Sequence, residues 1–116
     1  MSPPDDFVVR QLETSDDRSS FRSGNIDLDR FFQRYAGQNQ FRHHLGTTWV
    51  ATRGERVVGF ATISAAHLEV GEIPAPLQRR LPAYPLPVLR LARLAVAEEA
   101  QGQGVGRVLL RAVFTL

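Results

Sequence analysis

The sequence predicts a small domain of the α/β (α+β) class, and three observations support this fold class. Strand-like segments alternate with helical segments along the chain, and two of the strands are close enough in sequence to form a hairpin. Two other stretches carry their apolar residues on one helical face. A length of 116 residues with 43% hydrophobic content suits one core, so we expect residues 1–116 to form a single domain.

The N-terminal part predicts one strand followed by one helix. Residues 7–12 are apolar enough to join a sheet, and a polar connection follows them. We expect the helix to be capped by Asn25 or Asp27 and to weaken or end at Gly37. Its apolar face consists of Leu28, Phe31, Phe32, Tyr35 and Ala36.

The central part predicts a hairpin and then an irregular connection. Residues 47–52 and 57–64 read as two strands around a turn at 53–56. Residues 67–87 contain five prolines, a density that excludes a regular helix or a central strand across most of the segment. One short turn of helix fits within residues 77–81.

The C-terminal part predicts a strand, a glycine-rich turn and an amphipathic helix. Residues 88–96 form the strand, and we expect Arg90 and Arg93 to point to opposite faces because they are three residues apart. The helix begins near residue 104. Its apolar stripe consists of Val105, Val108, Leu109, Ala112, Val113 and Leu116. No terminating signal follows this stripe, so we expect the chain to stop within a domain.

The composition excludes several classes of protein. No Cys is present, which rules out a disulfide scaffold, a thiol nucleophile and a thiolate metal site. His43, His44 and His67 lack metal-ligand spacing, so we expect no metal. No membrane-length apolar run and no leader are present, and we therefore expect a cytoplasmic protein. All 14 basic residues are Arg, which fits either a genome bias or an anionic partner.

A strand, a glycine-rich turn and a helix in this order are typical of a phosphate-binding site. Gly102, Gly104 and Gly106 allow backbone N–H groups to approach an anion, and the helix start adds further donors. A flexible turn without a ligand is the alternative interpretation. The third glycine comes too early for a dinucleotide loop, and a Walker A loop needs a Lys that the chain lacks.

The pattern Gln101-x-x-Gly104-x-Gly106, directly after the strand, resembles the coenzyme A signature of the GNAT acetyltransferases. This resemblance implies the GNAT acyl-CoA N-acyltransferase fold, a mixed, mostly antiparallel sheet flanked by helices, here without its C-terminal strands. It implies acetyl-CoA as co-substrate and a bulged strand that offers backbone groups to pantetheine. The implied cofactor-binding residues are Leu94, Ala95, Val96, Gln101, Gly102, Gln103, Gly104, Val105, Gly106 and Arg107.

An upstream motif resembles one GNAT branch, the toxins of bacterial toxin–antitoxin pairs. It reads Phe21-x-Ser23-Gly24-x-x-x-Leu28-Asp29-x-Phe31-Phe32 and precedes the hairpin that contains Trp49. The resemblance implies acetylation of the α-amino group of aminoacyl-tRNA, a cognate antitoxin and a homodimer. A GNAT that acetylates a small-molecule or protein amine remains an alternative, as does a non-catalytic chain that binds CoA or an antitoxin.

No catalytic side chain is assigned from the sequence. The toxin branch places a tyrosine general acid in the C-terminal portion of the fold. Tyr35 lies on the apolar face of the first helix, and Tyr84 lies between prolines, so neither matches that position. Arg79 and Arg80 fit either an RNA phosphate contact or a solvated loop.

Overall fold

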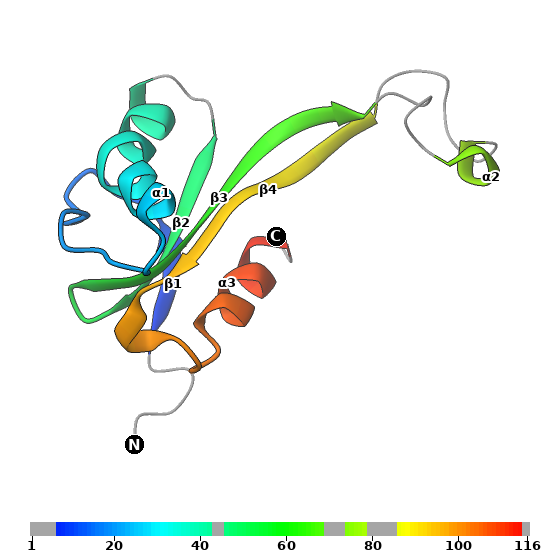
Figure 1. The fold of residues 1–116 in the computed structure, drawn as a ribbon. Helices are drawn as coiled ribbons and strands as arrows, with labels where there is room; N and C mark the ends of the chain where they lie inside the picture. Colours follow the sequence, from blue (N-terminus) through cyan, green and yellow to red (C-terminus); the bar gives the residue numbers. More distant parts are fainter. Residues whose placement is uncertain (1–6, 43–45, 69–73, 79–85, 115–116) are drawn as a thin grey trace.

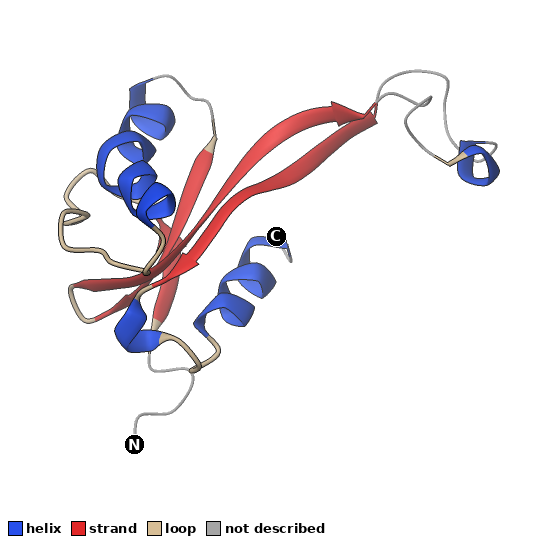
Figure 2. Ribbon diagram, in the orientation of Figure 1, coloured by secondary structure: helices blue, strands red, loops and turns tan. Residues whose placement is uncertain are grey.

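The computed structural model describes residues 7–42, 46–68, 74–78 and 86–114, which form an antiparallel sheet with helices on both faces (Figure 1). The sheet order is β1-β2-β3-β4, and each strand pairs with the next along the chain. The strands are β1 (Val8–Gln11), β2 (Thr47–Arg53), β3 (Arg56–Leu68) and β4 (Leu86–Val96). The predicted α/β (α+β) class is confirmed, and Figure 2 shows the helices on either side of the strands.

The first helix begins where the sequence predicts and continues further than expected. Helix α1 (Ile26–Arg30) is capped by Asn25, whose Oδ1 accepts a hydrogen bond from the Leu28 N–H at 3.0 Å. Two π-helical turns follow, η1 (Phe31–Tyr35) and η2 (Gln38–Arg42), so the expected end at Gly37 is wrong. Gly37 instead leaves room for a neighbour, because a Cβ there would lie 2.7 Å from Arg18 Nη2.

Aromatic rings fill the space between α1, η1 and the sheet. Phe32 stacks on Phe60 with ring centroids 4.5 Å apart, and Phe21 meets Phe32 edge-on at 4.9 Å. We call this side of the sheet the aromatic face. Its buried cluster consists of Leu12, Phe21, Phe31, Phe32, Ala36, Val50, Val57, Phe60, Ala95 and Ala97.

Helix α3 (Val105–Phe114) covers the opposite side, which we call the α3 face. The predicted helical stripe is confirmed as far as the described residues extend, with Val105, Leu109 and Val113 buried. Gly59 lies under the helix, where a Cβ would approach Val105 Cγ1 to 2.9 Å. The buried cluster consists of Phe7, Ala51, Val58, Ala61, Ile63, Ala100, Val105, Leu109 and Val113.

A β-bulge in β4 changes which side chains share a face. Thr62 pairs with Arg93 while Ile63 pairs with Leu91, so Ala92 is an extra residue in β4. Arg90 pairs with Ser64, two residues beyond Thr62 on the same face of β3. The expectation that Arg90 and Arg93 point to opposite faces is therefore wrong, because the bulge brings both to the aromatic face.

The hairpin of β3 and β4 is longer than the sequence predicts. The strand at 57–64 continues to Leu68, and its partner begins at Leu86, before the expected start at 88. Pro87 fits into this ladder because β4 has a neighbour on one side only among the described residues. A turn of helix forms as α2 (Ala75–Gln78), two residues before the expected start at 77, and residues 79–81 lie outside the described ranges.

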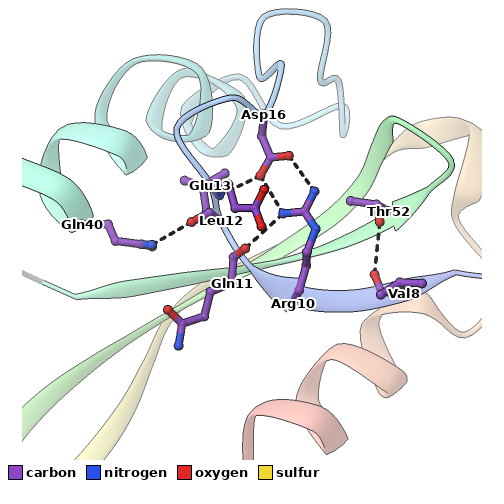
Figure 3. Close-up of polar contacts among 8 residues, drawn as sticks. All are labelled: Val8, Arg10, Gln11, Leu12, Glu13, Asp16, Gln40 and Thr52. Atoms are coloured by element: carbon purple, nitrogen blue, oxygen red, sulfur yellow. Dashed lines mark hydrogen bonds and ion pairs between the residues drawn. The ribbon is translucent and has the colours of Figure 1, made fainter.

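Polar side chains fix β1 and the connection after it (Figure 3). The Arg10 guanidinium donates two hydrogen bonds to the Asp16 carboxylate, at 2.8 and 2.7 Å. The Gln40 amide donates to the Leu12 carbonyl at 3.0 Å and accepts from the Thr48 N–H at 2.6 Å. Gln40 therefore joins η2 to two strands.

Candidate functional site

The glycine-rich loop follows β4 and a short turn, η4 (Glu98–Ala100), and leads into α3. Gly102 and Gly104 have φ values of 81° and 84°, in the left-handed region that favours glycine. A Cβ at either position would have no heavy atom within 4 Å, so this side of the loop is open. The backbone of the loop is therefore accessible to a ligand, and a longer side chain at Gly104 would occupy the open space.

The first turn of α3 supplies hydrogen-bond donors beside this open space. The Gly104 carbonyl accepts from the Val108 N–H at 3.1 Å, which places Gly104 at the helix cap. The N–H groups of Val105, Gly106 and Arg107 have no carbonyl partner within the helix, because they belong to its first turn. These donors and the positive end of the helix dipole favour an anion such as a pyrophosphate.

The end of β4 presents its backbone at the open edge of the sheet. The Ala97 N–H donates to the Val58 carbonyl at 2.8 Å, so Ala97 points its backbone groups toward β3. Backbone groups alternate along an antiparallel strand, and those of Val96 and Leu94 therefore point away from β3. Ala95 packs its side chain in the aromatic face, whereas Leu94 and Val96 contact the α3 face.

The Gln101 side chain holds the loop and does not offer donors to an anion. Its amide nitrogen donates to the Ser23 carbonyl at 2.8 Å and to the Val96 carbonyl at 3.0 Å. Both amide hydrogens are therefore used, and the remaining oxygen is an acceptor that does not suit a phosphate. No sequence signal links Ser23 to the loop, since 78 residues separate it from Gln101.

The loop is also attached to the turn between β2 and β3. The Gln103 Oε1 accepts from Arg53 Nη2 at 2.9 Å, and the Gln103 amide donates to the Glu99 carbonyl at 3.3 Å. Glu99 forms an ion pair with Arg56. Arg53 and Arg56 carry no sequence signal for this role, because only the fold brings their turn to the loop.

The ten residues expected at the cofactor site thus form a continuous path. It runs from the outer edge of β4 through the glycine-rich loop to the first turn of α3. Of the other residues singled out from the sequence, Tyr35 is 46% exposed on η1, so its expected place on the buried apolar face of the first helix is wrong. His43, His44, Arg79, Arg80 and Tyr84 lie outside the described residues.

Two of the hollows among the described residues lie away from this path. One, of about 450 Å³, is found at the other end of α3 and is lined in part by Trp49, Leu89 and Phe114. The second, of about 260 Å³, lies on the outer side of α1 and η1. It is lined by Arg22, Ile26, Asp29, Arg30, Gln33 and Arg34.

Two arginines of β4 add positive charge on the aromatic face. The Arg93 guanidinium lies over the Phe31 ring, 3.8 Å from its centroid. Arg90 points to the same face because of the bulge at Ala92. Among the described residues, no group of three His, Cys, Asp or Glu side chains is placed to hold a metal. None of the described helices has the length and apolar character of a membrane span.

The geometry of a bulged edge strand, a glycine-rich loop and a helix start agrees with a family comparison. Residues 44–116 match the model of the acetyltransferase (GNAT) domain, and the chain belongs to this family. The family assignment expected from Gln101, Gly104 and Gly106 is therefore confirmed.

One relative that the chain matches is a toxin. The chain is 35% identical over 102 residues to a tRNA-acetylating toxin of Mycobacterium tuberculosis (strain ATCC 25618 / H37Rv). This match covers 88% of the chain and 60% of the relative, so the chain spans less than two thirds of that protein's length.

Solved toxin structures share the fold. AtaT complexed with acetyl-methionyl-tRNAfMet has a TM-score of 0.81 at 22% identity, over 94% of this chain and 67% of AtaT. A mutant AtaT toxin bound to acetyl-CoA and the C-terminus of the antitoxin AtaR has a TM-score of 0.75 at 24% identity. That match covers 96% of this chain and 65% of the toxin.

Proposed function

We propose that the protein is an N-acetyltransferase that transfers the acetyl group of acetyl-CoA to a primary amine. The observation that carries this proposal is the continuous backbone path from the open edge of β4 to the first turn of α3. Membership of the GNAT family supports it. Residues 1–116 would act as one domain in this reaction.

Most residues of the path would hold acetyl-CoA, while Gln101, whose N–H groups already donate to Ser23, Val96 and Glu98, would hold the loop in place. The N–H groups of the loop and of the first turn of α3 would bind the pyrophosphate, with the exposed Arg107 beside them. The backbone of Leu94 and Val96 would pair with the amide-rich pantetheine arm. The Val96 carbonyl already accepts from Gln101, so the Leu94 groups and the Val96 N–H would carry the pairing.

The proposed reaction needs few groups from the protein. The uncharged amine attacks the acetyl carbonyl carbon, a C–N bond forms and the thioester C–S bond breaks. The nitrogen loses a proton, and the thiolate takes one up. An α-amino group has a pKa of about 8, so no strong base is needed. A backbone N–H at residues 94–96 would polarise the carbonyl, and proximity of the two substrates would supply much of the rate.

We propose the α-amino group of aminoacyl-tRNA as the acceptor. The Mycobacterium tuberculosis relative is named a tRNA-acetylating toxin, which supports this choice. The basic surface of α1 and η1 supports it as well, because Arg22, Arg30 and Arg34 line one hollow there. Guanidinium groups match phosphate oxygens in geometry and charge.

A cytoplasmic location, a cognate antitoxin and a homodimer belong to the same proposal. Aminoacyl-tRNA is a cytoplasmic substrate, and this supports the location. The similar AtaT toxin was solved with the C-terminus of its antitoxin AtaR, which supports the antitoxin. The exposed apolar residues Leu89 and Phe114, beside the larger hollow, support a covering partner or a second copy.

Calorimetric titration of acetyl-CoA into the 116-residue chain tests the donor site. The control is a Gly104→Glu, Gly106→Glu variant. The carboxylate introduced at position 104 would occupy the open side of the loop, and a second carboxylate at position 106 adds negative charge in the first turn of α3, so that both repel phosphate. We expect binding that the variant loses. A folded wild-type chain that does not bind acetyl-CoA would contradict the proposed function.

Acetylation of charged tRNA, followed with radiolabelled acetyl-CoA, then tests the acceptor. Acetyl transfer to aminoacyl-tRNA and none to uncharged tRNA supports the proposal. Transfer only to small or protein amines would favour a different acceptor, and binding without any transfer would favour a non-catalytic role.

A further inference from the structure

The motif at the start of α1 contains a buried carboxylate that the proposed function does not use. Asp29 is only 8% exposed, although it lies in a helix near the surface. Its two oxygens accept from the Ser23 N–H at 3.0 and 3.1 Å, and Oδ1 also accepts from the Ser23 hydroxyl at 2.6 Å. These three bonds compensate for the burial of the charge and fix the orientation of Ser23.

Ser23 in turn contacts the glycine-rich loop. Its carbonyl accepts from Gln101 Nε2 at 2.8 Å, and the same nitrogen donates to the Val96 carbonyl at 3.0 Å. A chain of hydrogen bonds therefore runs from Asp29 through Ser23 to Gln101. It ends at the junction of β4 and the loop, where the proposed donor site begins.

Two more contacts join the same segments. The Glu98 N–H donates to the Arg22 carbonyl at 2.8 Å. Gly24 has a φ of 96°, and a Cβ there would lie 3.0 Å from Glu98 Oε1. Residues 22–24 thus lie against residues 98–101 at three points, which explains why a glycine follows Ser23 in the motif.

We propose that Asp29 is a positioning residue for acyl-CoA, acting through Ser23 and Gln101 on the glycine-rich loop. Gly102 and Gly104 make the loop accessible but give it little stiffness of its own. The hydrogen-bond chain from Asp29 supplies that stiffness from a neighbouring helix. A loop held in its binding shape loses less conformational entropy when the pyrophosphate binds.

This inference rests on the proposed function, and its test uses two donor ligands with the 116-residue chain. Acetyl-CoA carries the pyrophosphate, whereas S-acetylpantetheine lacks phosphate and meets only the edge of β4. The variants are Asp29→Asn, which turns an acceptor into a donor, and Gln101→Met, which keeps the length and removes both donors. The matched control is Asp27→Asn, an exposed residue of the same helix turn with the same charge change.

We expect both variants to raise the Kd for acetyl-CoA by about three- to tenfold, the effect of one lost hydrogen bond. The Kd of both variants for S-acetylpantetheine should change less than about twofold. The same limit applies to the Kd of the control Asp27→Asn for either ligand. The double variant Asp29→Asn, Gln101→Met should bind acetyl-CoA no more weakly than Gln101→Met alone, since the two residues act in one chain.

Three results would overturn the inference while leaving the proposed function intact. They are equal losses for both ligands, multiplicative effects in the double variant, and acetyl-CoA binding that Asp29→Asn does not alter. Thermal melts of each variant show whether it is folded at the assay temperature. An unfolded Asp29→Asn leaves Gln101→Met to decide between the two ligands. A folded wild-type chain that binds no acetyl-CoA would overturn the inference and the proposed function together.

Discussion

The two faces of the sheet are packed in different ways. The aromatic face is filled by large rings, with Phe60 in contact with Phe21, Phe31 and Phe32. The α3 face is filled by smaller side chains, and Gly59 lets α3 approach the strands closely. The difference indicates two roles, in which one face is filled by stacked aromatic rings and the other brings a helix start close to the edge of β4.

The largest expected effect belongs to the aromatic face. Phe32 is fully buried and stacks on Phe60, so Phe32→Ala should lower the free energy of unfolding by about 3–5 kcal/mol. Urea denaturation followed by circular dichroism measures this change. Ile26→Ala on the exposed side of α1 is the control, with an expected loss below about 0.5 kcal/mol. Equal losses in the two variants would refute the assignment of the core.

The second effect concerns the close approach on the α3 face. Gly59→Ala would place a methyl group 2.9 Å from Val105 Cγ1 and 3.1 Å from Leu109 Cδ1. We expect a loss of about 1–3 kcal/mol in unfolding free energy and weaker acetyl-CoA binding, because α3 must move.

Gly106→Ala is the matched control for Gly59→Ala. Its Cβ would meet Val96 Cγ2 at an ordinary 3.7 Å, inside a helix. It should therefore raise the unfolding free energy by about 0.5–1 kcal/mol. If the unfolding free energy changed in the same direction in Gly59→Ala and Gly106→Ala, this result would contradict the packing described for the α3 face.

The third effect concerns the positive charges on the outer side of the helices that cover the two faces of the sheet. Arg30→Gln, Arg34→Gln removes two cations beside the smaller hollow, on the helix that covers the aromatic face. Under the proposed acceptor, the Kd for a fluorescent tRNA should rise about five- to twentyfold, and the salt dependence of binding should become shallower. Fluorescence anisotropy at several salt concentrations measures both quantities.

The control for this arginine pair removes the same charge elsewhere. Arg56→Gln, Arg111→Gln changes the β2–β3 turn and α3. A similar loss of tRNA affinity in this control would show that net charge, and not the surface of α1 and η1, determines binding.

The smallest effect involves the ion pair of Arg10 and Asp16, at the margin of the sheet. The hydrogen bonds from Arg10 hold the pKa of Asp16 below its ordinary value. Asp16→Asn should therefore lower the unfolding free energy at pH 7 by about 0.5–1 kcal/mol. The wild-type advantage is present above the ordinary pKa of about 4 and disappears as the pH falls through the lowered value. Thermal melts from pH 7 downward measure the gap, and a gap that does not narrow as the pH falls below about 4 would contradict this origin.

Local sequence signals predicted the elements of the fold well. The helical phase of Leu28, Phe31 and Phe32 and the Asn25 cap depend on neighbouring residues, and both are confirmed. The hairpin turn at Gly54, with a φ of 64°, follows from local turn chemistry in the same way.

Features that depend on distant contacts were not predictable. The helical segment continues through Gly37, which lies against the distant Arg18 guanidinium. The family resemblance implies a bulged strand, but the position of the bulge at Ala92 is set by pairing with β3, and it reverses the expected relation of Arg90 and Arg93. Of the candidate site, the loop and helix start followed from the glycine pattern, whereas the bonds from Gln101 to Ser23 and Val96 exist only in the folded chain.

The extra residue in β4, Ala92, shifts by one position the alternation of side chains between the two faces of the sheet. Leu89 and Leu91 above it, and Leu94 and Val96 below it, all belong to the α3 face, although the two pairs are out of step in sequence. Deleting Ala92 would remove the bulge and leave every side chain of β4 on its present face, whereas deleting one residue elsewhere in the arm would exchange the sides of the residues beyond it toward the hairpin tip. Away from the bulge, changes in the length of this arm are therefore tolerated only in steps of two residues.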